Sequence, residues 1–170
     1  KPKYILIELP HGATKTEDFL LYKRTLLGQY PDELIQFFFV NTDVGCPEIA
    51  HEIAIQLQDR FEIHIIQSHI PRTFIDCNRV IGENISYKAG GVTPATPSYV
   101  HNETDIHVLR EAYFSYQNYV HKIYENLCGI KNGFALMLHT YAPRSVPITK
   151  VDDNIVAELR KYYDNDKIQE

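Results

Sequence analysis

Two short apolar runs stand out along the chain, and each leads directly into a histidine. The first covers residues 4–9 and runs into a Pro-His-Gly turn that contains His11. The second covers residues 134–138 and is followed by His139. Runs of this length are typical of buried strands in a parallel sheet. Because ligands bind outside the carboxyl ends of such strands, both imidazoles are expected at the functional edge of the sheet.

Helical patterns alternate with these apolar runs. The first predicted helix begins with Thr16 as N-cap and ends near Gly28. Further helices are predicted over residues 47–57, over residues 103–127 and from about residue 152. A further strand is predicted over residues 61–66. The apolar residues 36–40 fit a strand or the end of a short helix equally well. This alternation predicts one α/β domain of three layers that spans residues 1–170.

Composition and charge narrow the class of protein. The chain has 170 residues, of which 44% are hydrophobic and 23% charged, as in an ordinary globular domain. A net charge of -5 and the lack of a basic run argue against nucleic-acid and membrane-surface partners. No apolar stretch approaches the ~18 residues of a membrane span. Three cysteines without a CxxC pair fit a reducing compartment, so a cytoplasmic protein is expected.

The two histidines predict a metal site once a third ligand is found. Catalytic zinc takes three protein ligands and keeps one position for water. Asp43 follows an apolar run and precedes a helix, and it is the preferred third ligand. Glu17, in the first turn of the helix after His11, is the alternative ligand, although an acid at that place also stabilises the helix dipole. We therefore expect His11, Asp43 and His139 to bind a divalent metal, preferably zinc.

A cluster of guanidinium and amide groups follows the strand predicted at 61–66. Arg72, Asn78 and Arg79 suit a carboxylate, because the guanidinium fork grips it in two-point geometry and the amide adds a neutral donor. Asp76 is expected to orient one guanidinium by a charge-assisted bond. The cluster predicts a binding site for a substrate carboxylate or oxyanion beside the metal; the plainer alternative is a surface ion-pair cluster.

Cys46 offers a different chemistry. It lies at a predicted helix start, where the helix dipole lowers the pKa of a thiol and favours a nucleophile. A purely structural role for this small residue is the competing interpretation.

These motifs, in this order, resemble the N-formylglutamate amidohydrolase family. Pro10-His11-Gly12, Asp43-Val44-Gly45, Arg72 with Asp76-Cys77-Asn78-Arg79, and Leu138-His139 carry the resemblance, which covers most of the chain. The Asp-x-Asn-Arg element also resembles the aspartoacylase branch of the zinc-carboxypeptidase-like hydrolases. The resemblance implies a phosphorylase/hydrolase-like fold with a mixed, mostly parallel sheet between helices. It also implies cleavage of the N-acyl amide of a small acidic amino acid such as N-formylglutamate.

The chain departs from the family pattern at three places. Gly12 stands where the family usually has Ser, and Cys77 where an aliphatic residue is common. The carboxypeptidase-like mechanism uses a late glutamate as general base, but only Glu158 and Glu170 follow His139, in unpromising places. The expectation is therefore a metal-dependent amidohydrolase with Glu17 as substitute base, in a domain that is C-terminally incomplete. The alternative is a catalytically degenerate carboxylate-binding domain of the same fold.

Overall fold

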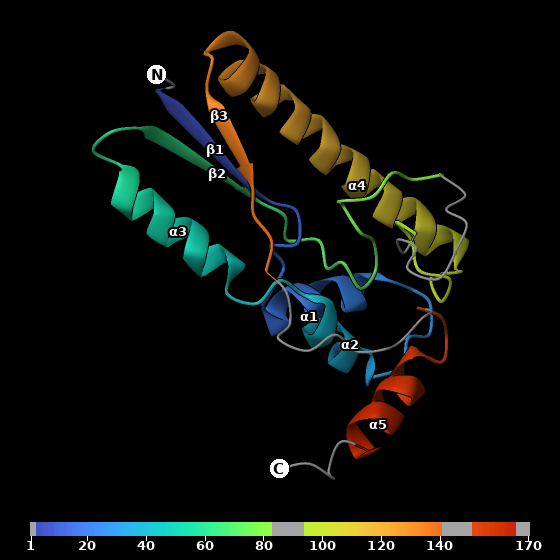
Figure 1. Cartoon of the computed structure of the whole chain (residues 1–170). Helices are drawn as coiled ribbons and strands as arrows, with labels where there is room; N and C mark the ends of the chain where they lie inside the picture. Colours follow the sequence, from blue (N-terminus) through green and yellow to red (C-terminus); the bar gives the residue numbers. More distant parts are fainter. Residues whose placement is uncertain (1–2, 83–93, 141–150, 166–170) are drawn as a thin grey trace.

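The computed structural model describes residues 3–82, 94–140 and 151–165 (Figure 1). Along the chain the elements are β1 (Tyr4–Leu9), α1 (Thr16–Thr25), α2 (Leu34–Asn41), α3 (Cys46–Leu57), β2 (Glu62–Gln67), α4 (Glu103–Tyr124), the π-helical turn η1 (Glu125–Ile130), β3 (Phe134–Met137) and α5 (Ile155–Asn165). None of the helices in these ranges is both long and apolar enough to cross a membrane.

The strands form one parallel sheet in the order β2-β1-β3. In the register of the sheet, Ile7 of β1 lies opposite Ile65 of β2 and Leu136 of β3. The prediction that the two apolar runs before the histidines share a sheet is confirmed. All strands in the described part of the chain are parallel, so an antiparallel strand of the expected mixed sheet is not among them. Because β1 is followed by β2 on one side and later by β3 on the other, the strand order reverses between β1 and β3.

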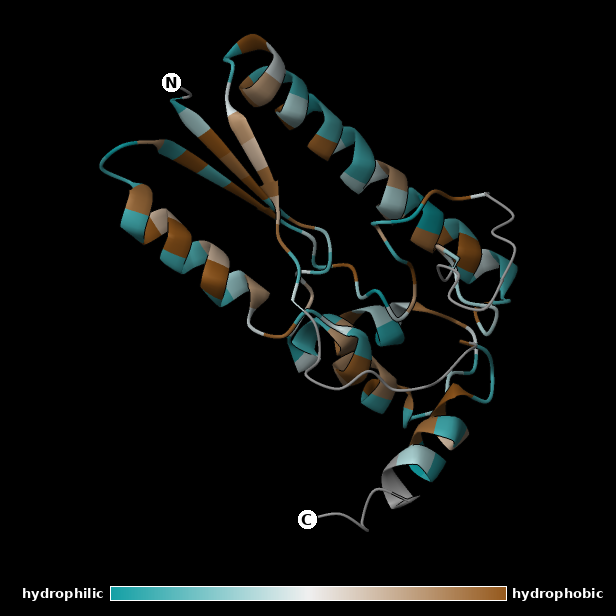
Figure 2. Ribbon diagram, in the orientation of Figure 1, coloured by the Kyte–Doolittle hydropathy of each residue, from teal (hydrophilic) through white to brown (hydrophobic). Residues whose placement is uncertain are grey.

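Helices cover both faces of this sheet, which confirms the three-layer α/β fold. Figure 1 shows α3 on one face and α4 on the other. The α3 face is filled by Ile5, Ile7, Leu9, Cys46 and Ala50. The α4 face is filled by Leu6, Ile66, Val120 and Leu127. Successive residues of a strand point to opposite faces, so both faces of β1 are covered and its residues 5–9 are all buried. Figure 2 shows that apolar residues dominate β1, whereas β2 mixes polar and apolar residues.

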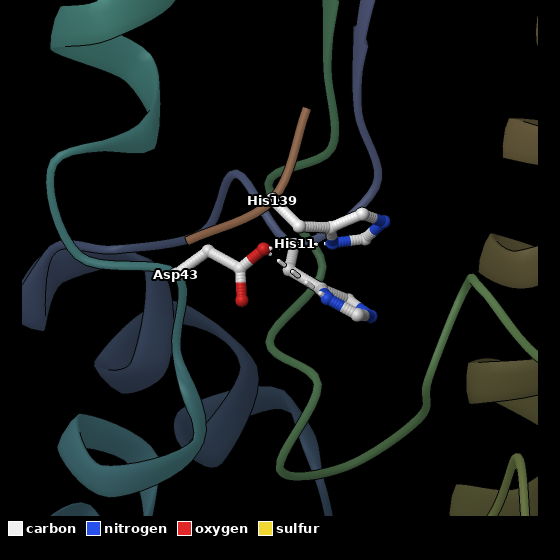
Figure 3. A group of neighbouring side chains, drawn as sticks. All are labelled: His11, Asp43 and His139. Carbon is white, nitrogen blue, oxygen red and sulfur yellow. Dashed lines mark hydrogen bonds and ion pairs between the residues drawn. The ribbon is translucent and has the colours of Figure 1, made fainter. Parts of the chain in front are cut away.

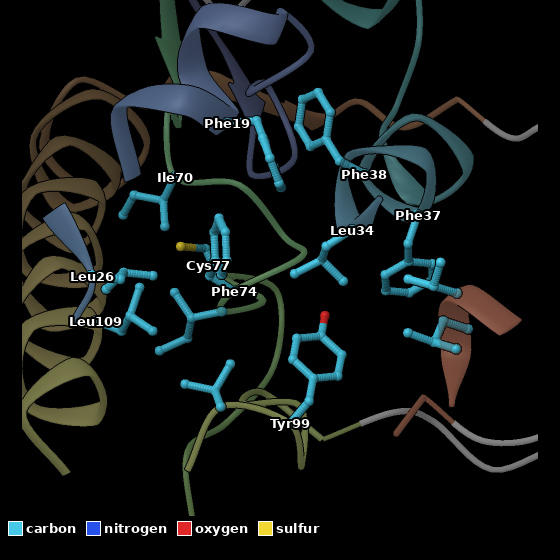
Figure 4. Close-up of a cluster of buried hydrophobic side chains, with 14 of the residues drawn as sticks. Phe19, Leu26, Leu34, Phe37, Phe38, Ile70, Phe74, Cys77, Tyr99 and Leu109 are labelled. Atoms are coloured by element: carbon cyan, nitrogen blue, oxygen red, sulfur yellow. The ribbon is translucent and has the colours of Figure 1, made fainter. Parts of the chain in front are cut away.

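A second and larger core lies beyond the carboxyl ends of the strands. It joins α1, α2, α5 and the first half of α4 to the segment of residues 70–77 (Figure 4). At its centre the ring of Phe19 lies 5.4 Å from that of Phe38 and 5.3 Å from that of Phe74. These large buried rings fix the segment that carries the predicted carboxylate-binding groups, although that segment has no regular secondary structure of its own.

Three local details differ from the sequence expectations. The ambiguous apolar run belongs to a helix, α2, whose Leu34, Phe37 and Phe38 are buried in the larger core. The N-cap of α1 is Lys15 rather than Thr16, and the backbone N–H of Lys15 donates to the Asp18 carboxylate at 3.2 Å. The long helix α4 does not simply stop before Gly129 but passes into the π-helical turn η1.

Candidate metal centre and anion-binding segment

His11 and His139 lie on the two sides of the point where the strand order reverses. His11 comes two residues after the end of β1, and His139 two residues after the end of β3. Ligands of doubly wound sheets bind at such a reversal, because the chain diverges there and leaves a crevice at the carboxyl ends of the strands. Asp43 reaches the same place from the connection between α2 and α3 (Figure 3).

The three side chains converge closely. His139 Nδ1 lies 2.8 Å from Asp43 Oδ2, and His11 Nδ1 lies 3.5 Å from the same oxygen. One potential ligand atom from each residue falls within 4.8 Å of the others. Two ligands bound tetrahedrally to zinc at roughly 2.1 Å lie about 3.4 Å apart. The spacing is therefore close to what a metal would require, and the structure brings together the three residues expected from the sequence.

One ring nitrogen of His11 is buried without a hydrogen-bond partner. The His11 side chain is only 3% exposed, and its Nδ1 is one of two such orphaned side-chain atoms among the described residues. Its other nitrogen, Nε2, lies 2.7 Å from Asp76 Oδ1. A carboxylate at Nε2 favours the tautomer in which Nε2 carries the proton and Nδ1 offers a lone pair. In metal sites, a carboxylate that does not bind the metal often orients a metal-binding histidine in this way.

The charges of the cluster reinforce one another. Burial alone would lower the pKa of His11, but the carboxylates of Asp43 and Asp76 outweigh it and raise that pKa. Burial alone would raise the pKa of Asp43, but His11 and His139 hold it below its usual value. For Asp76 the same opposition, with the Arg72 charge added, lowers the pKa to about 2. Both carboxylates are therefore ionised at neutral pH and attract a cation.

The predicted carboxylate-binding residues adjoin this cluster through Asp76. Arg72 Nε donates to Asp76 Oδ2 at 3.0 Å, which is the expected guanidinium–carboxylate contact. Arg79 Nε lies 4.0 Å from the same oxygen and is the second buried atom without a hydrogen-bond partner in the described ranges. The side-chain amide of Asn78 lies 3.4 Å from His139 Nε2. The structure thus brings Arg72, Asn78 and Arg79 to the edge of the histidine cluster.

Asp76 has a larger part than the sequence suggested. Besides Arg72 it holds His11, and its Oδ1 accepts the backbone N–H of Asn78 at 2.8 Å. It therefore connects the candidate metal ligands to the anion-binding segment. Its position two residues before Asn78 in the Asp-x-Asn-Arg element is the sequence signal that could have indicated this role.

Two other candidates stand apart from the cluster. Glu17 is exposed in the first turn of α1 and does not belong to the cluster, whose third residue is Asp43. Cys46 is 1% exposed, and its thiol donates to the Leu138 carbonyl at 3.2 Å. Burial, with the Asp43 charge added, raises its pKa to about 11, so the structure argues against an activated thiol nucleophile. All three cysteines, each within the described ranges, are free thiols.

Comparisons of the chain with protein-family models, with curated proteins and with solved structures gave no match. The functional interpretation therefore depends on the motifs and on the geometry of this site. The site offers two imidazoles and a carboxylate for a cation, with guanidinium and amide donors beside them for an anion.

Proposed function

We propose that this protein is a cytoplasmic, metal-dependent amidohydrolase that cleaves the N-acyl amide of a small acidic amino acid such as N-formylglutamate. One observation carries the proposal. The two buried side-chain atoms without a hydrogen-bond partner in the described chain, His11 Nδ1 and Arg79 Nε, both belong to this site. Buried polar groups are otherwise almost always hydrogen-bonded, so this pair points to a bound cation beside a bound anion.

The donor set matches a catalytic metal. Two imidazoles and one carboxylate are the ligands of many zinc hydrolases, which leave a fourth position open. When bound, zinc supplies Lewis-acid polarisation of the scissile carbonyl and a lowered pKa for its water. Asp76 orients His11 by accepting from Nε2, and Asp43 contacts both imidazoles. A divalent metal, preferably zinc, is the cofactor of the proposal.

The anion-binding residues define the substrate. Arg72 is anchored through its Nε by Asp76, and Arg79 is held through its Nη1 by the Asn78 carbonyl at 2.8 Å. Both guanidiniums are about a quarter exposed, at 27% and 23% of the side chain, so a ligand has access to them. With Asn78 they bind the carboxylate of the amino acid and stabilise the oxyanion that forms at the acyl carbon.

Hydrolysis also requires a proton carrier. Water adds to the acyl carbon, the C–N bond breaks, and the departing amine takes up a proton. A carboxylate placed for this transfer contributes about 10²- to 10⁴-fold to the rate. Glu17 is the carboxylate that the proposal assigns to this step, because it lies on the helix that follows His11.

A second function is favoured by the exposure of the candidate bases. Glu17 and Glu158 are both exposed, and Glu170 lies outside the described residues. Without a positioned base, the same cluster and guanidiniums would make a carboxylate-binding domain that does not catalyse hydrolysis. The two functions share every ligand contact and differ only in turnover.

Metal analysis combined with hydrolysis tests the proposal. Protein purified without added metal and then supplied with one equivalent of zinc is expected to retain one ion and to hydrolyse N-formyl-L-glutamate. N-Butylformamide, which lacks carboxylates, is expected to be a poor substrate. Ligand binding without turnover would select the binding domain, and failure to retain zinc would reject the metal-dependent amidohydrolase.

A further inference from the structure

The segment of residues 71–79 is irregular, yet several of its backbone carbonyls are held by side chains from elsewhere. Tyr99 donates its hydroxyl to the Thr73 carbonyl. Gln117 donates its side-chain amide to the Cys77 carbonyl at 2.6 Å. Tyr113 donates its hydroxyl to the carbonyl of Arg79 at 2.7 Å. Buried backbone groups outside helices and sheets need such partners, so these contacts fix the path of the segment.

Two of the three donors come from one face of α4. Tyr113 and Gln117 are four residues apart, and positions with that spacing lie next to each other on a helix surface. Tyr113 is buried, with 7% exposure, so its hydroxyl is not exchanging freely with water. The carbonyls that they hold directly precede Asn78 and belong to Arg79. The two contacts therefore bracket the two residues proposed to bind the substrate carboxylate.

The helix that provides these donors is itself fixed to the sheet. Tyr116 and Tyr124 of α4 donate to the two oxygens of the buried Glu8 of β1, at 2.9 and 2.7 Å. β1 also leads into His11, so α4 connects the strand of a candidate metal ligand to the anion-binding segment. The placement of the candidate metal ligand His11 relative to Asn78 and Arg79 thus depends partly on a helix that would contribute no ligand.

We propose that Tyr113 and Gln117 are positioning residues that set the orientation of Asn78 and Arg79 toward the substrate carboxylate. Arg79 Nε has no hydrogen-bond partner in the described chain, and its Nη1 bonds only to the neighbouring Asn78 carbonyl. Apart from the attraction of the Asp76 carboxylate, which lies 4.0 Å from Nε, its orientation therefore depends on the backbone that Tyr113 and Gln117 hold. Small displacements of a binding group lose much of its effect on a reaction, because the geometry of the bound substrate is lost.

The test uses Tyr113→Phe and Gln117→Met, which keep the buried volume and remove only the donors. Tyr119→Phe, at a 58% exposed position of the same helix, is the matched control. The substrate effect rests on the proposed function. For hydrolysis of N-formyl-L-glutamate, each variant is expected to raise KM about 3- to 10-fold, the size of one hydrogen bond, with kcat changed less than about 2-fold. Zinc retention is expected to be unchanged, whereas a purely structural defect would lower kcat and zinc content together.

Hydrogen–deuterium exchange of peptides covering residues 71–82 tests the positioning without any activity. Faster exchange in Tyr113→Phe and Gln117→Met than in the parent protein and in Tyr119→Phe is expected. Unchanged exchange in both variants would overturn the proposal. Faster exchange with an unchanged KM would overturn the claim that this positioning affects binding of the substrate carboxylate. Faster exchange in the two variants, together with a parent protein that neither binds nor hydrolyses N-formylglutamate, would support the positioning and reject the proposed function instead.

Discussion

Two clusters of buried polar groups adjoin β1, and they differ in how completely their hydrogen bonds are made. Glu8, within the strand, is 4% exposed, and each of its oxygens accepts a tyrosine hydroxyl. His11, just past the strand, is equally buried at 4%, but its Nδ1 has no hydrogen-bond partner among the described residues. Burial is the same in both clusters, so it does not distinguish a structural from a functional group.

Buried polar atoms without a hydrogen-bond partner distinguish the functional cluster from the structural one. An unpaired buried polar group costs roughly 1–3 kcal/mol, so a fold keeps one where a ligand can pair with it. The Glu8 cluster has no atom left for a ligand, and it holds α4 against the sheet. The histidine cluster has a ring nitrogen without a hydrogen-bond partner among the described residues, two ionised carboxylates and an adjoining guanidinium, which suit a cation and an anion together. The predictions below change one cluster at a time.

His139→Ala is expected to abolish metal binding, because it removes one of the three candidate ligands. His139 is less buried than His11, with 20% of its side chain exposed, so its removal disturbs the fold less. At zinc concentrations 100 times the dissociation constant, the parent protein is expected to gain about 2.7 kcal/mol of stability, and the variant none. Thermal unfolding with and without zinc measures this. His107→Ala, at an exposed histidine of α4, is the control and should respond like the parent protein.

The Glu8 cluster is expected to show the opposite behaviour. Glu8→Ala leaves the hydroxyls of Tyr116 and Tyr124 without their buried acceptor, which is expected to lower the free energy of unfolding by about 2–5 kcal/mol. Glu8→Gln keeps an acceptor and is expected to cost about 1 kcal/mol. Denaturant unfolding measures both changes. Zinc bound per folded molecule should not change in either variant, and a loss of zinc with little loss of stability would contradict the comparison.

Glu17 belongs to neither cluster, and its exposed carboxylate tests whether the site catalyses at all. As the proposed proton acceptor, it is expected to contribute about 10²-fold to kcat, the low end for a general base that is solvated before substrate binds. Steady-state kinetics of Glu17→Gln with N-formyl-L-glutamate measure this, with zinc retention unchanged. Turnover equal to that of the parent protein would place the base elsewhere.

Much of the fold and the clustering of the candidate metal ligands could be predicted from the sequence because they depend on local patterns. The apolar runs before His11 and His139 are contiguous, and the rule that parallel strands end at one edge brings the two histidines together. Asp43 could be selected by its place between an apolar run and a helix start. The same kind of reasoning left α2 undecided, because four apolar residues in a row, at 37–40, have no distinctive period.

The contacts that organise the site could not be predicted in the same way. The bond between His11 and Asp76 joins residues 65 positions apart and depends on how an irregular segment packs against the larger core. Tyr113 and Tyr116 have helical spacing, which indicates a core-facing side but does not reveal that one hydroxyl holds Arg79 and the other Glu8. Such long-range polar contacts follow from packing rather than from local periodicity.

Asp76→Asn is expected to weaken metal binding without abolishing it, and so to define the boundary of the functional cluster. The Asp76 carboxylate accepts from His11 Nε2 but does not belong to the group of clustered metal ligands. Replacing a carboxylate that orients a metal-binding histidine typically costs 10- to 100-fold in metal affinity, since the neutral amide no longer favours the ligating tautomer. Competition titrations with a zinc chelator measure this change.

Asp105→Asn is the control and should change stability but not zinc affinity. The buried Asp105 carboxylate accepts from Leu27, Gly28 and Tyr30, far along the chain from the site. An Asp76→Asn protein with the zinc affinity of its parent would mean that the unpaired His11 nitrogen is not a metal ligand, and the contrast with Glu8 would then need another cause.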